Sequence, residues 1–267
     1  MKDYLLGAII GDVCGKPYEF PIAARTKNYN QVNLYNPKAR FSDDTVCIIG
    51  IADAFIRNNN PSENEIGFYL QNWCIKYPHA GYGGRFRNWI ADRKPYNSWG
   101  NGSAMRVSAV GYVARSLEEC EELATRTAII SHNHPEGIKG AVITAKAIWY
   151  ARRHDYNAIE ELLITNYPEY AKLDLEEIRK NYKFYESCQD TVPVALKCFL
   201  DSVNFEDCIT LAISMGGDSD TLAAIAGSIA WADYQDASDK LVLFVKDRLP
   251  EGIIKIIKDF DKIVQDV

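Results

Sequence analysis

The 267-residue sequence has no uncharged run long enough to cross a membrane and no cluster of Lys and Arg residues. The first absence predicts a chain that does not enter a membrane. The second, together with a net charge of −6, disfavours nucleic-acid binding through phosphate contacts. The apolar stretch near the start is short and is interrupted by Asp12, unlike a secretory signal, so we expect a cytoplasmic protein.

Closely spaced cysteine pairs are also missing. The chain has seven cysteines but no Cys-x-x-Cys motif. Their odd number and scattered positions argue against a disulfide framework and against a zinc site. We therefore expect reduced thiols that act as small core residues at positions 14, 47, 74, 120, 188, 198 and 208.

Persuasive alternating patterns and Gly/Ser-rich linkers are absent as well, which argues against a sheet and against several domains. Apolar residues instead recur at helical spacing, and 47% of the chain is hydrophobic. This pattern predicts an all-α fold, a compact single-domain helical bundle over residues 1–267, and we expect a monomer. Helices are expected near 5–13, 46–56, 63–76, 103–115, 117–130, 136–152, 158–165, 191–201, 205–214, 219–233 and 253–264, with long loops at 21–41, 78–101 and 166–190.

Two of the expected helices begin with acidic clusters. Asp218, Asp220 and Thr221 open the helix at 219–233, and Ser42–Thr45 opens the helix that continues through Ile56. Either cluster alone is explained by helix capping and by the positive end of the helix dipole. Together they fit the two halves of a hard-cation site for Mg²⁺ or Mn²⁺, since neither contains His or Cys. Cations would also offset the repulsion among four carboxylates.

The helix at 219–233 alternates small and large apolar residues. Ala223, Ala226, Gly227 and Ala230 let a neighbouring helix approach closely. We therefore expect this helix at the centre of the bundle, with its acidic first turn at the edge of the core. Charges in that position need partners.

Glu19 is an acidic residue without an obvious local role. Gly15 and Pro17 are expected to end the first helix, which would leave Glu19 on a turn. It is either a solvated loop residue or a mobile carboxylate over the cations.

The segment Tyr96–Val107 (YNSWGNGSAMRV) places Gly100 and Gly102 just before a helix. Glycines there allow backbone amides to approach a phosphate, although turns use the same residues generally. Tyr96 and Trp99 are candidates for stacking on a base, or else core aromatics.

The segment Ser131–Gly137 (SHNHPEG) contains two histidines. Their i, i+2 spacing is poor for joint metal binding. His132 is therefore interpreted as a phosphate or ribose contact, or as a structural histidine.

In this order, GDVCGKPYE, FSDDT, GNGSAMR, SHNHPEG and GGDSDT resemble motifs of the ADP-ribosylglycohydrolases, the superfamily of the dinitrogenase-reductase-activating glycohydrolase and the human ADP-ribosylhydrolases. The resemblance extends from Gly11 to Thr221. It implies an all-α fold with two Mg²⁺ ions, or Mn²⁺, in a central cleft. Ser42 replaces the threonine common at its position. The implied metal ligands are Ser42, Asp43, Asp44, Asp218, Asp220 and Thr221.

The same resemblance implies roles for other residues. Glu19 matches a glutamate on a mobile flap that gates the site in some members, and either Glu19 or Asp43 is the expected acid or base. The chain is shorter than the human members, which leaves the acceptor open. The implied substrate-binding residues are Tyr96, Ser98, Trp99, Gly100, Asn101, Gly102 and His132.

The resemblance thus implies a hydrolase that reverses ADP-ribosylation. Its partners would be an ADP-ribosylated substrate and the ADP-ribose product, and the acceptor a protein side chain, a nucleic-acid base or a small molecule. Two alternatives remain: a binuclear-metal enzyme that releases phosphate from a nucleotide, and a non-catalytic ADP-ribose-binding descendant of the fold. Retention of all four aspartates and of Glu19 argues against the second alternative.

Overall fold

A computed structural model describes residues 2–20 and 26–264 of the chain. Over these residues the regular structure is helical, and extended pairing is limited to an isolated bridge between Gly100 and Ser187. The all-α prediction is therefore confirmed. The helices are α1 (Leu6–Glu19), the 3₁₀ helix η2 (Tyr29–Gln31), α2 (Asp43–Arg57), α3 (Glu63–Lys76), α4 (Gly84–Asp92), α5 (Gly102–Met105), α6 (Ser108–Val113), α7 (Leu117–Ile129), α8 (Pro135–Ala151), α9 (Tyr156–Asn166), α10 (Pro168–Ala171), α11 (Leu175–Asn181), α12 (Cys188–Leu200), α13 (Phe205–Ile213), α14 (Ser219–Asp233), α15 (Asp239–Lys246) and α16 (Glu251–Asp261).

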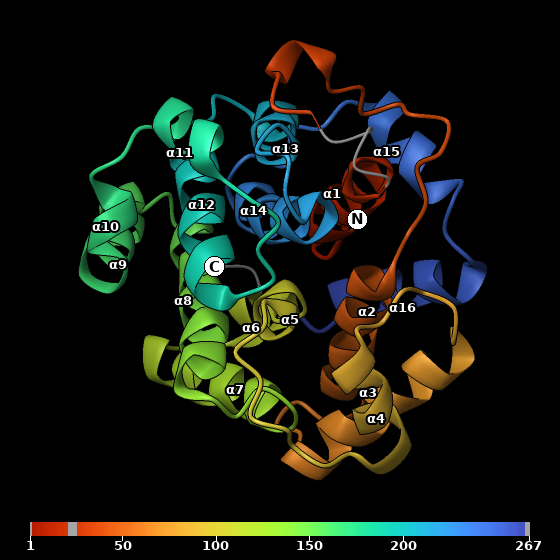
Figure 1. Cartoon of the computed structure of the whole chain (residues 1–267). Coiled ribbons are helices and arrows are strands. Elements are labelled where there is room, and N and C mark those ends of the chain that lie inside the picture. Colours follow the sequence, from red (N-terminus) through yellow and green to blue (C-terminus); the bar gives the residue numbers. More distant parts are fainter. Residues whose placement is uncertain (1, 21–25, 265–267) are drawn as a thin grey trace.

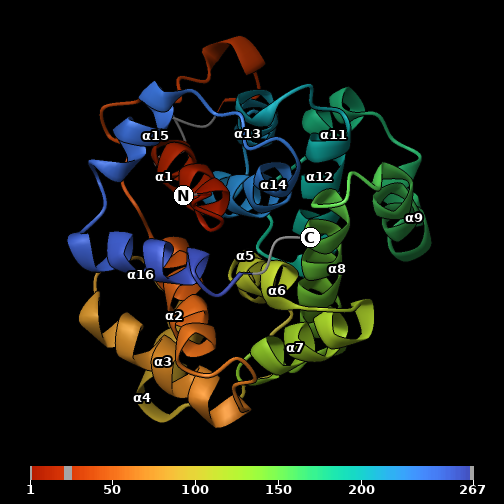
Figure 2. The ribbon, with the colours of Figure 1, turned by 180° about the vertical axis from the view of Figure 1, so that it is seen from behind.

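Helix α14 lies in the middle of the bundle, as its small residues predicted. It packs against α1, α8, α12 and α13, which surround it in both views (Figures 1 and 2). Every residue from Ser219 to Ala232 is buried. Among the described helices, including the apolar α14, none has the length and hydropathy needed to cross a membrane.

Helices α1 and α14 lie unusually close because glycines line their contact. Gly7, Gly11 and Gly15 recur every four residues and therefore share one face of α1. A Cβ atom added to Gly11 would lie 2.1 Å from the Ala223 carbonyl oxygen, and one added to Gly15 would lie 2.6 Å from Asp220 Cα. No larger side chain fits at these positions, so the glycines set the distance between the two helices.

The seven cysteines behave as the sequence predicted. All are buried and all carry free thiols. They fill space in the core next to aliphatic side chains, and none pairs with another in a disulfide.

Two expected helix boundaries were wrong. Pro17 does not end α1, because a proline in the last turn removes only one helical hydrogen bond; the helix continues through Glu19. The helix expected at 103–115 is divided into α5 and α6 around Arg106, whose fully buried side chain bonds to α7 and to Ser131.

The long loops are also more structured than expected. The 78–101 segment contains α4, and the 166–190 segment contains α10 and α11. In the 21–41 segment, residues 21–25 lie outside the described part of the chain, and the remainder contains η2. Helix α15 was not expected.

The close contact of α1 with α14 can be tested with Gly11→Ala. The added Cβ atom would overlap the Ala223 carbonyl, so the helices must separate. We expect the free energy of unfolding, measured by urea denaturation, to fall by about 1–3 kcal/mol. In the control Gly84→Ala, no atom lies within 4 Å of the added Cβ atom, so this helical substitution should be neutral or slightly stabilising. Equal stability of Gly11→Ala and wild type would contradict the packing argument.

Candidate metal centre and substrate cleft

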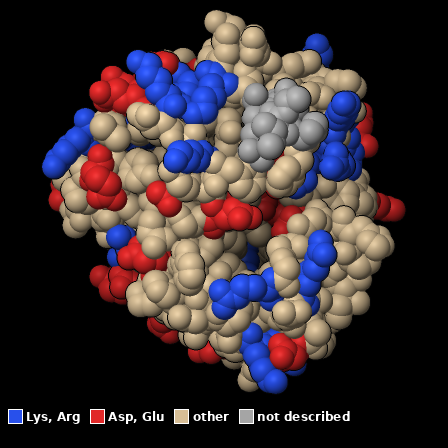
Figure 3. Space-filling model, viewed as in Figure 1, with Lys and Arg blue, Asp and Glu red and all other residues tan. Residues whose placement is uncertain are grey.

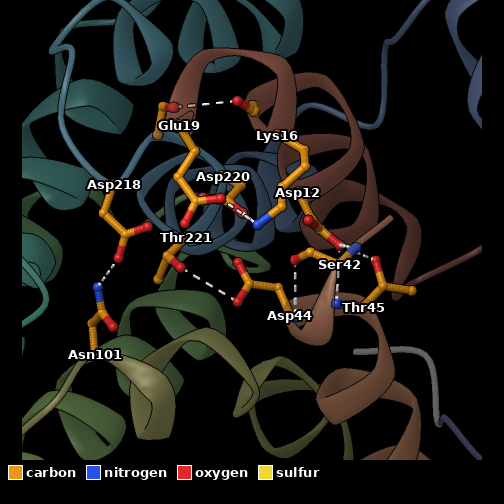
Figure 4. Close-up of polar contacts among 12 residues, drawn as sticks. Asp12, Lys16, Glu19, Ser42, Asp44, Thr45, Asn101, Asp218, Asp220 and Thr221 are labelled. Atoms are coloured by element: carbon orange, nitrogen blue, oxygen red, sulfur yellow. Dashed lines mark hydrogen bonds and ion pairs between the residues drawn. The ribbon is translucent and has the colours of Figure 1, made fainter. Parts of the chain in front are cut away.

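One face of α1 carries three charged residues toward the middle of the molecule. Asp12, Lys16 and Glu19 follow at i, i+4 and i+7, which places them on one side of the helix. Figure 4 shows them facing the first turns of α2 and α14. The glycine face of α1 lies beside this charged face, so the same close packing brings the charged residues to α14.

Asp12 holds the start of α2. Its Oδ2 atom accepts hydrogen bonds from the backbone N–H of Ser42 at 2.9 Å, from the N–H of Thr45 at 3.0 Å and from the Thr45 hydroxyl. The Ser42 hydroxyl also caps α2, accepting from the N–H of Asp44 at 3.2 Å. Asp12 was not predicted as a site residue. The available signal was a carboxylate within an otherwise apolar helical stretch.

The first turn of α14 is not capped as expected. Asp218 occupies the N-cap position, but its side chain makes no capping hydrogen bond. Its Oδ2 atom instead accepts from the Asn101 amide at 2.8 Å. The Thr221 hydroxyl donates to Asp44 Oδ1 at 3.3 Å, which joins the two acidic helix starts directly. The carboxylate of Asp218 is therefore available to the cleft and is not consumed by the helix.

The carboxylates converge in two groups that share Asp220. Asp12, Asp44 and Asp220 each offer one oxygen within 4.8 Å of the others, and so do Glu19, Asp218 and Asp220. Asp and Glu side chains gather at a hollow in the middle of the face in Figure 3. Oxygen-only groups of this kind suit hard divalent cations. Thus the structure unites the two acidic clusters that the sequence singled out.

Three buried oxygens of the first group lack donors. Asp12 Oδ1, Asp44 Oδ2 and Asp220 Oδ1 have no hydrogen-bond partner among the described residues. A buried carboxylate oxygen without a donor or a cation is costly. The three oxygens come from three different residues of one cluster, Asp12, Asp44 and Asp220. This set of oxygen ligands fits a hard cation.

Asp43 lies beside these groups and belongs to neither. Its backbone N–H donates to the Ala80 carbonyl at 3.1 Å, and its Oδ1 atom lies 3.0 Å from where a Cβ atom on Gly81 would stand. Burial, and then the charge of Asp220, raise the pKa of Asp43 to about 7. The predicted convergence of Asp43 with the other three aspartates is thus only partial.

Lys16 is a site residue that sequence analysis missed. Its ammonium donates to Asp220 Oδ2 at 2.8 Å and also to the Glu19 carboxylate (Figure 4). The pKa of Glu19 is nevertheless raised to about 7, because burial and the charge of Asp220 outweigh the pairing with Lys16. The signal in the sequence was the helical spacing of Lys16 between Asp12 and Glu19.

Burial governs the electrostatics of the remaining carboxylates. It raises the pKa of Asp12, Asp44 and Asp218 above the ordinary range, and the charge of Asp220 adds to the effect in each case. Desolvation and like charge both disfavour ionised carboxylates. Bringing these groups together therefore costs stability unless cations accompany them.

The 96–102 segment lies next to Asp218 through Asn101. The N–H groups of Gly100 and Asn101 already donate within the protein, to Ser98 Oγ at 3.1 Å and to the Glu186 carbonyl at 2.8 Å. They are not free for a phosphate in this arrangement. The Trp99 side chain is 48% exposed, so the core interpretation of this residue was wrong.

His132 faces the same segment from the buried side. Its ring lies 5.7 Å from the Tyr96 ring, and its Nε2 atom lies 3.0 Å from where a Cβ atom on Gly102 would stand. Arg106 donates to Ser131 Oγ at 2.8 Å, and Ser131 Oγ lies 2.8 Å from His132 Nδ1. A serine oxygen has two acceptor lone pairs, so the bond from Arg106 is compatible with either direction of the bond between Ser131 and Nδ1.

The pKa of His132 is shifted by its surroundings. Burial, followed by the charges of Arg106 and Arg85, lowers it well below the usual value. The ring is therefore neutral, and its Nε2 atom is the ring nitrogen that lies next to Gly102. Arg106 and Ser131 were not predicted, because a buried arginine looks like any surface residue in a sequence.

A cavity of about 670 Å³ opens on the acidic cluster from the α1–α3 side. It shares Lys16 and Glu19 with the cluster, and most of its other lining residues are cationic or aromatic. These are Phe20, Arg40, Phe41, Lys76, Tyr77 and His79. Arg40 and Lys76 form no ion pair with any carboxylate of the described residues. The cleft thus has an acidic centre and a cationic side.

The fold and the centre define a class: an all-α protein with buried carboxylates arranged for hard cations. The family model described as ADP-ribosylglycohydrolase matches residues 1–234. The chain therefore belongs to the ADP-ribosylglycohydrolase family.

Relatives agree with this assignment. The chain is 24% identical to ADP-ribosylhydrolase ARH3 of Bos taurus, over 86% of this chain and 83% of that protein. It is 25% identical to ADP-ribosylarginine hydrolase Tri1 of Pseudomonas putida, over 87% of this chain and 70% of that protein. A solved structure titled ADP-ribosylglycohydrolase-related protein complex has the same fold, with a TM-score of 0.72, 20% identity and coverage of 99% and 97%.

The raised pKa values predict how pH affects the metal-free protein. Glu19 and Asp43 titrate near 7 in the folded state and near 4.5 and 3.8 when unperturbed. The unfolded chain therefore releases these protons first, and their contribution to stability is present below about pH 4 and lost as the pH rises toward 7. With EDTA present, the free energy of unfolding should fall by up to about 1.4 kcal/mol per pH unit for each group.

The measurement is urea denaturation at pH 5, 6 and 7, for wild type and for Glu19→Gln/Asp43→Asn. The difference between the two proteins isolates these groups from other titrations. We expect the variant to gain stability relative to wild type as the pH rises. A difference that stays constant across this range would contradict the prediction.

Proposed function

We propose that the protein is a divalent-cation-dependent hydrolase that cleaves the glycosidic bond between C1″ of ADP-ribose and an acceptor. The observation that carries the proposal is the trio of buried oxygens on Asp12, Asp44 and Asp220 without donors among the described residues. Membership of the ADP-ribosylglycohydrolase family supports the reaction class.

The residues that would hold cations come from three helices. Asp12 of α1, Asp44 of α2 and Asp220 of α14 form one group, and Asp218 and Glu19 extend it around Asp220. Ser42 and Thr221 stand beside them, already bonded to Asp44. When bound, Mg²⁺ or Mn²⁺ would neutralise these acids, hold ribose hydroxyls and orient water for attack.

Proton transfer falls to a carboxyl that titrates near neutral pH. Glu19 and Asp43 are the proposed candidates, because burial beside Asp220 raises the pKa of each to about 7 in the metal-free protein, and bound cations would set the value from there. Glu19 borders the cavity and Asp43 lies against Gly81. The carboxylates near C1″ would also stabilise the positive charge that develops when a glycosidic bond breaks.

The nucleotide part of the substrate is assigned to the 96–102 segment. Asn101 contacts Asp218, which places this segment at one end of the acidic centre. The exposed Trp99 ring offers a stacking surface for adenine or ribose, and His132 Nε2, when it carries the ring hydrogen, offers a donor for a phosphate or hydroxyl oxygen. Side chains are thus proposed to share the phosphate contacts that the sequence assigned to the backbone amides of the 96–102 segment.

The acceptor is then assigned to the cavity on the opposite side of Lys16 and Glu19. Arg40 and Lys76 make this side positive, and Phe41 and Tyr77 add aromatic surface. A guanidinium leaving group would meet like charge here, whereas a hydroxyl-linked or anionic acceptor would not. The proposed acceptor is therefore neutral or negative.

The first test replaces one carboxylate without changing its shape. Asp44→Asn removes a negative charge and an anionic ligand from the group with orphaned oxygens. We expect the protein to remain folded and kcat/KM for ADP-ribose release to fall by more than about 100-fold. The control Asp92→Asn changes an exposed residue of α4 and should have no effect.

The products of that assay decide between reaction classes. Chromatography of the wild-type reaction should show free ADP-ribose and the intact acceptor. Inorganic phosphate or AMP as the first product would indicate a phosphohydrolase and would overturn the proposal.

The second test concerns acceptor charge. Wild type and Arg40→Glu/Lys76→Glu should be compared on ADP-ribosyl-serine and ADP-ribosyl-arginine. We expect wild type to favour the serine substrate, and the double variant to raise the arginine-to-serine ratio of kcat/KM by about tenfold or more. Arg87→Glu, on the exposed surface of α4, is a single charge reversal outside the cavity and should leave the ratio unchanged. The same ratio in all three proteins would rule out the assignment of the cavity.

A further inference from the structure

Lys16 places a cation inside the acidic centre of the protein itself. Its ammonium contacts Asp220 Oδ2 at 2.8 Å and pairs with Glu19. The Lys16 and Glu19 side chains are each 12% exposed, and that of Asp220 is 3% exposed. An ion pair at this depth is weakly screened by solvent, so its charge acts on every neighbouring carboxylate.

The two carboxylate groups differ in what already satisfies them. In the Glu19–Asp218–Asp220 group, Lys16 donates to Glu19 and Asp220, and Asn101 donates to Asp218. In the Asp12–Asp44–Asp220 group, each residue keeps one buried oxygen without a donor among the described residues. The buried oxygens without donors are therefore on one side of Asp220, and the Lys16 ammonium is on the other.

We propose that Lys16 is a built-in counter-cation that makes the two cation positions unequal. The first divalent cation binds at Asp12, Asp44 and Asp220 while Lys16 stays in place. A second binds at Glu19, Asp218 and Asp220 only after the ammonium has moved away. This inference rests on the proposed function, because it presumes that the carboxylates hold divalent cations.

The cavity beside Lys16 has room for the displaced ammonium. Lys16 borders the 670 Å³ cavity, and its four-carbon stem has several rotatable bonds. Rotation into the cavity would separate the ammonium from Asp220 without moving α1. Arg40 and Lys76 border the same space and repel an incoming ammonium, which favours its return to the carboxylates when the second position is empty.

The inference is tested by counting cation sites in the absence of substrate. Wild type and Lys16→Met are titrated with Mg²⁺ by calorimetry and with Mn²⁺ by electron paramagnetic resonance. Methionine keeps the apolar stem and removes the charge. We expect one tight and one weak site in wild type. In Lys16→Met the weak site should tighten by about tenfold or more, since a like charge a few ångströms away is gone.

A second readout does not depend on bound metal. In EDTA, Lys16→Met leaves Glu19 and Asp220 without their cation, so its melting temperature should lie below that of wild type. Saturating Mg²⁺ should reduce or reverse the difference. Lys16→Arg keeps the charge and should retain the unequal sites. Lys172→Met removes an exposed lysine that belongs neither to the cavity nor to the carboxylate groups, and should bind cations like wild type.

The outcomes separate this inference from the proposed function. Two equally tight sites in wild type would overturn the role of Lys16 and leave the proposed hydrolase standing; that result needs no variant and holds even if Lys16→Met fails to fold. Unchanged affinities in a folded Lys16→Met would also overturn it. No cation binding in either protein would overturn the metal requirement and the inference together.

Discussion

The contact between α1 and α14 is the constraint on which the rest of the structure depends. Three glycines at four-residue spacing bring the backbone of α1 against the Ala223 carbonyl and Asp220 Cα. The neighbouring face of α1 carries Asp12, so its carboxylate arrives beside that of Asp220. Larger side chains at these glycines would move α1 away from α14 and separate the two carboxylates. The geometry of the site would then be lost although all of its residues were still present.

This arrangement places like charges where water cannot screen them. Each carboxylate has a donor from another part of the chain. Asp12 accepts from backbone N–H groups at the start of α2, Asp218 from the amide of Asn101, and Asp220 from the ammonium of Lys16. Each donor bonds to one oxygen of its carboxylate, and the other oxygen faces the neighbouring carboxylates. The protein thus keeps a centre that is stable enough to fold and incomplete enough to attract cations.

Sequence reasoning succeeded where a feature is local or periodic. The 3.6-residue period identified most helices, and small residues located α14 at the centre. It failed at one helix end, because Pro17 removes only one hydrogen bond from the last turn of α1 and Glu19 stays helical. It also failed where long-range contacts decide the outcome. Asp12 and Arg106 were missed because their partners come from other helices, which spacing alone does not reveal.

The hydrogen-bond chain from Arg106 through Ser131 to His132 gives the cleft two ends that respond differently to acid. The imidazole is neutral because burial and the nearby arginines lower its pKa well below the usual value, so its charge stays the same from mildly acidic to alkaline solution. The carboxyl groups at the other end change protonation near pH 7. Under the proposed function, a change in pH is therefore expected to alter turnover far more than it alters how firmly the nucleotide is held.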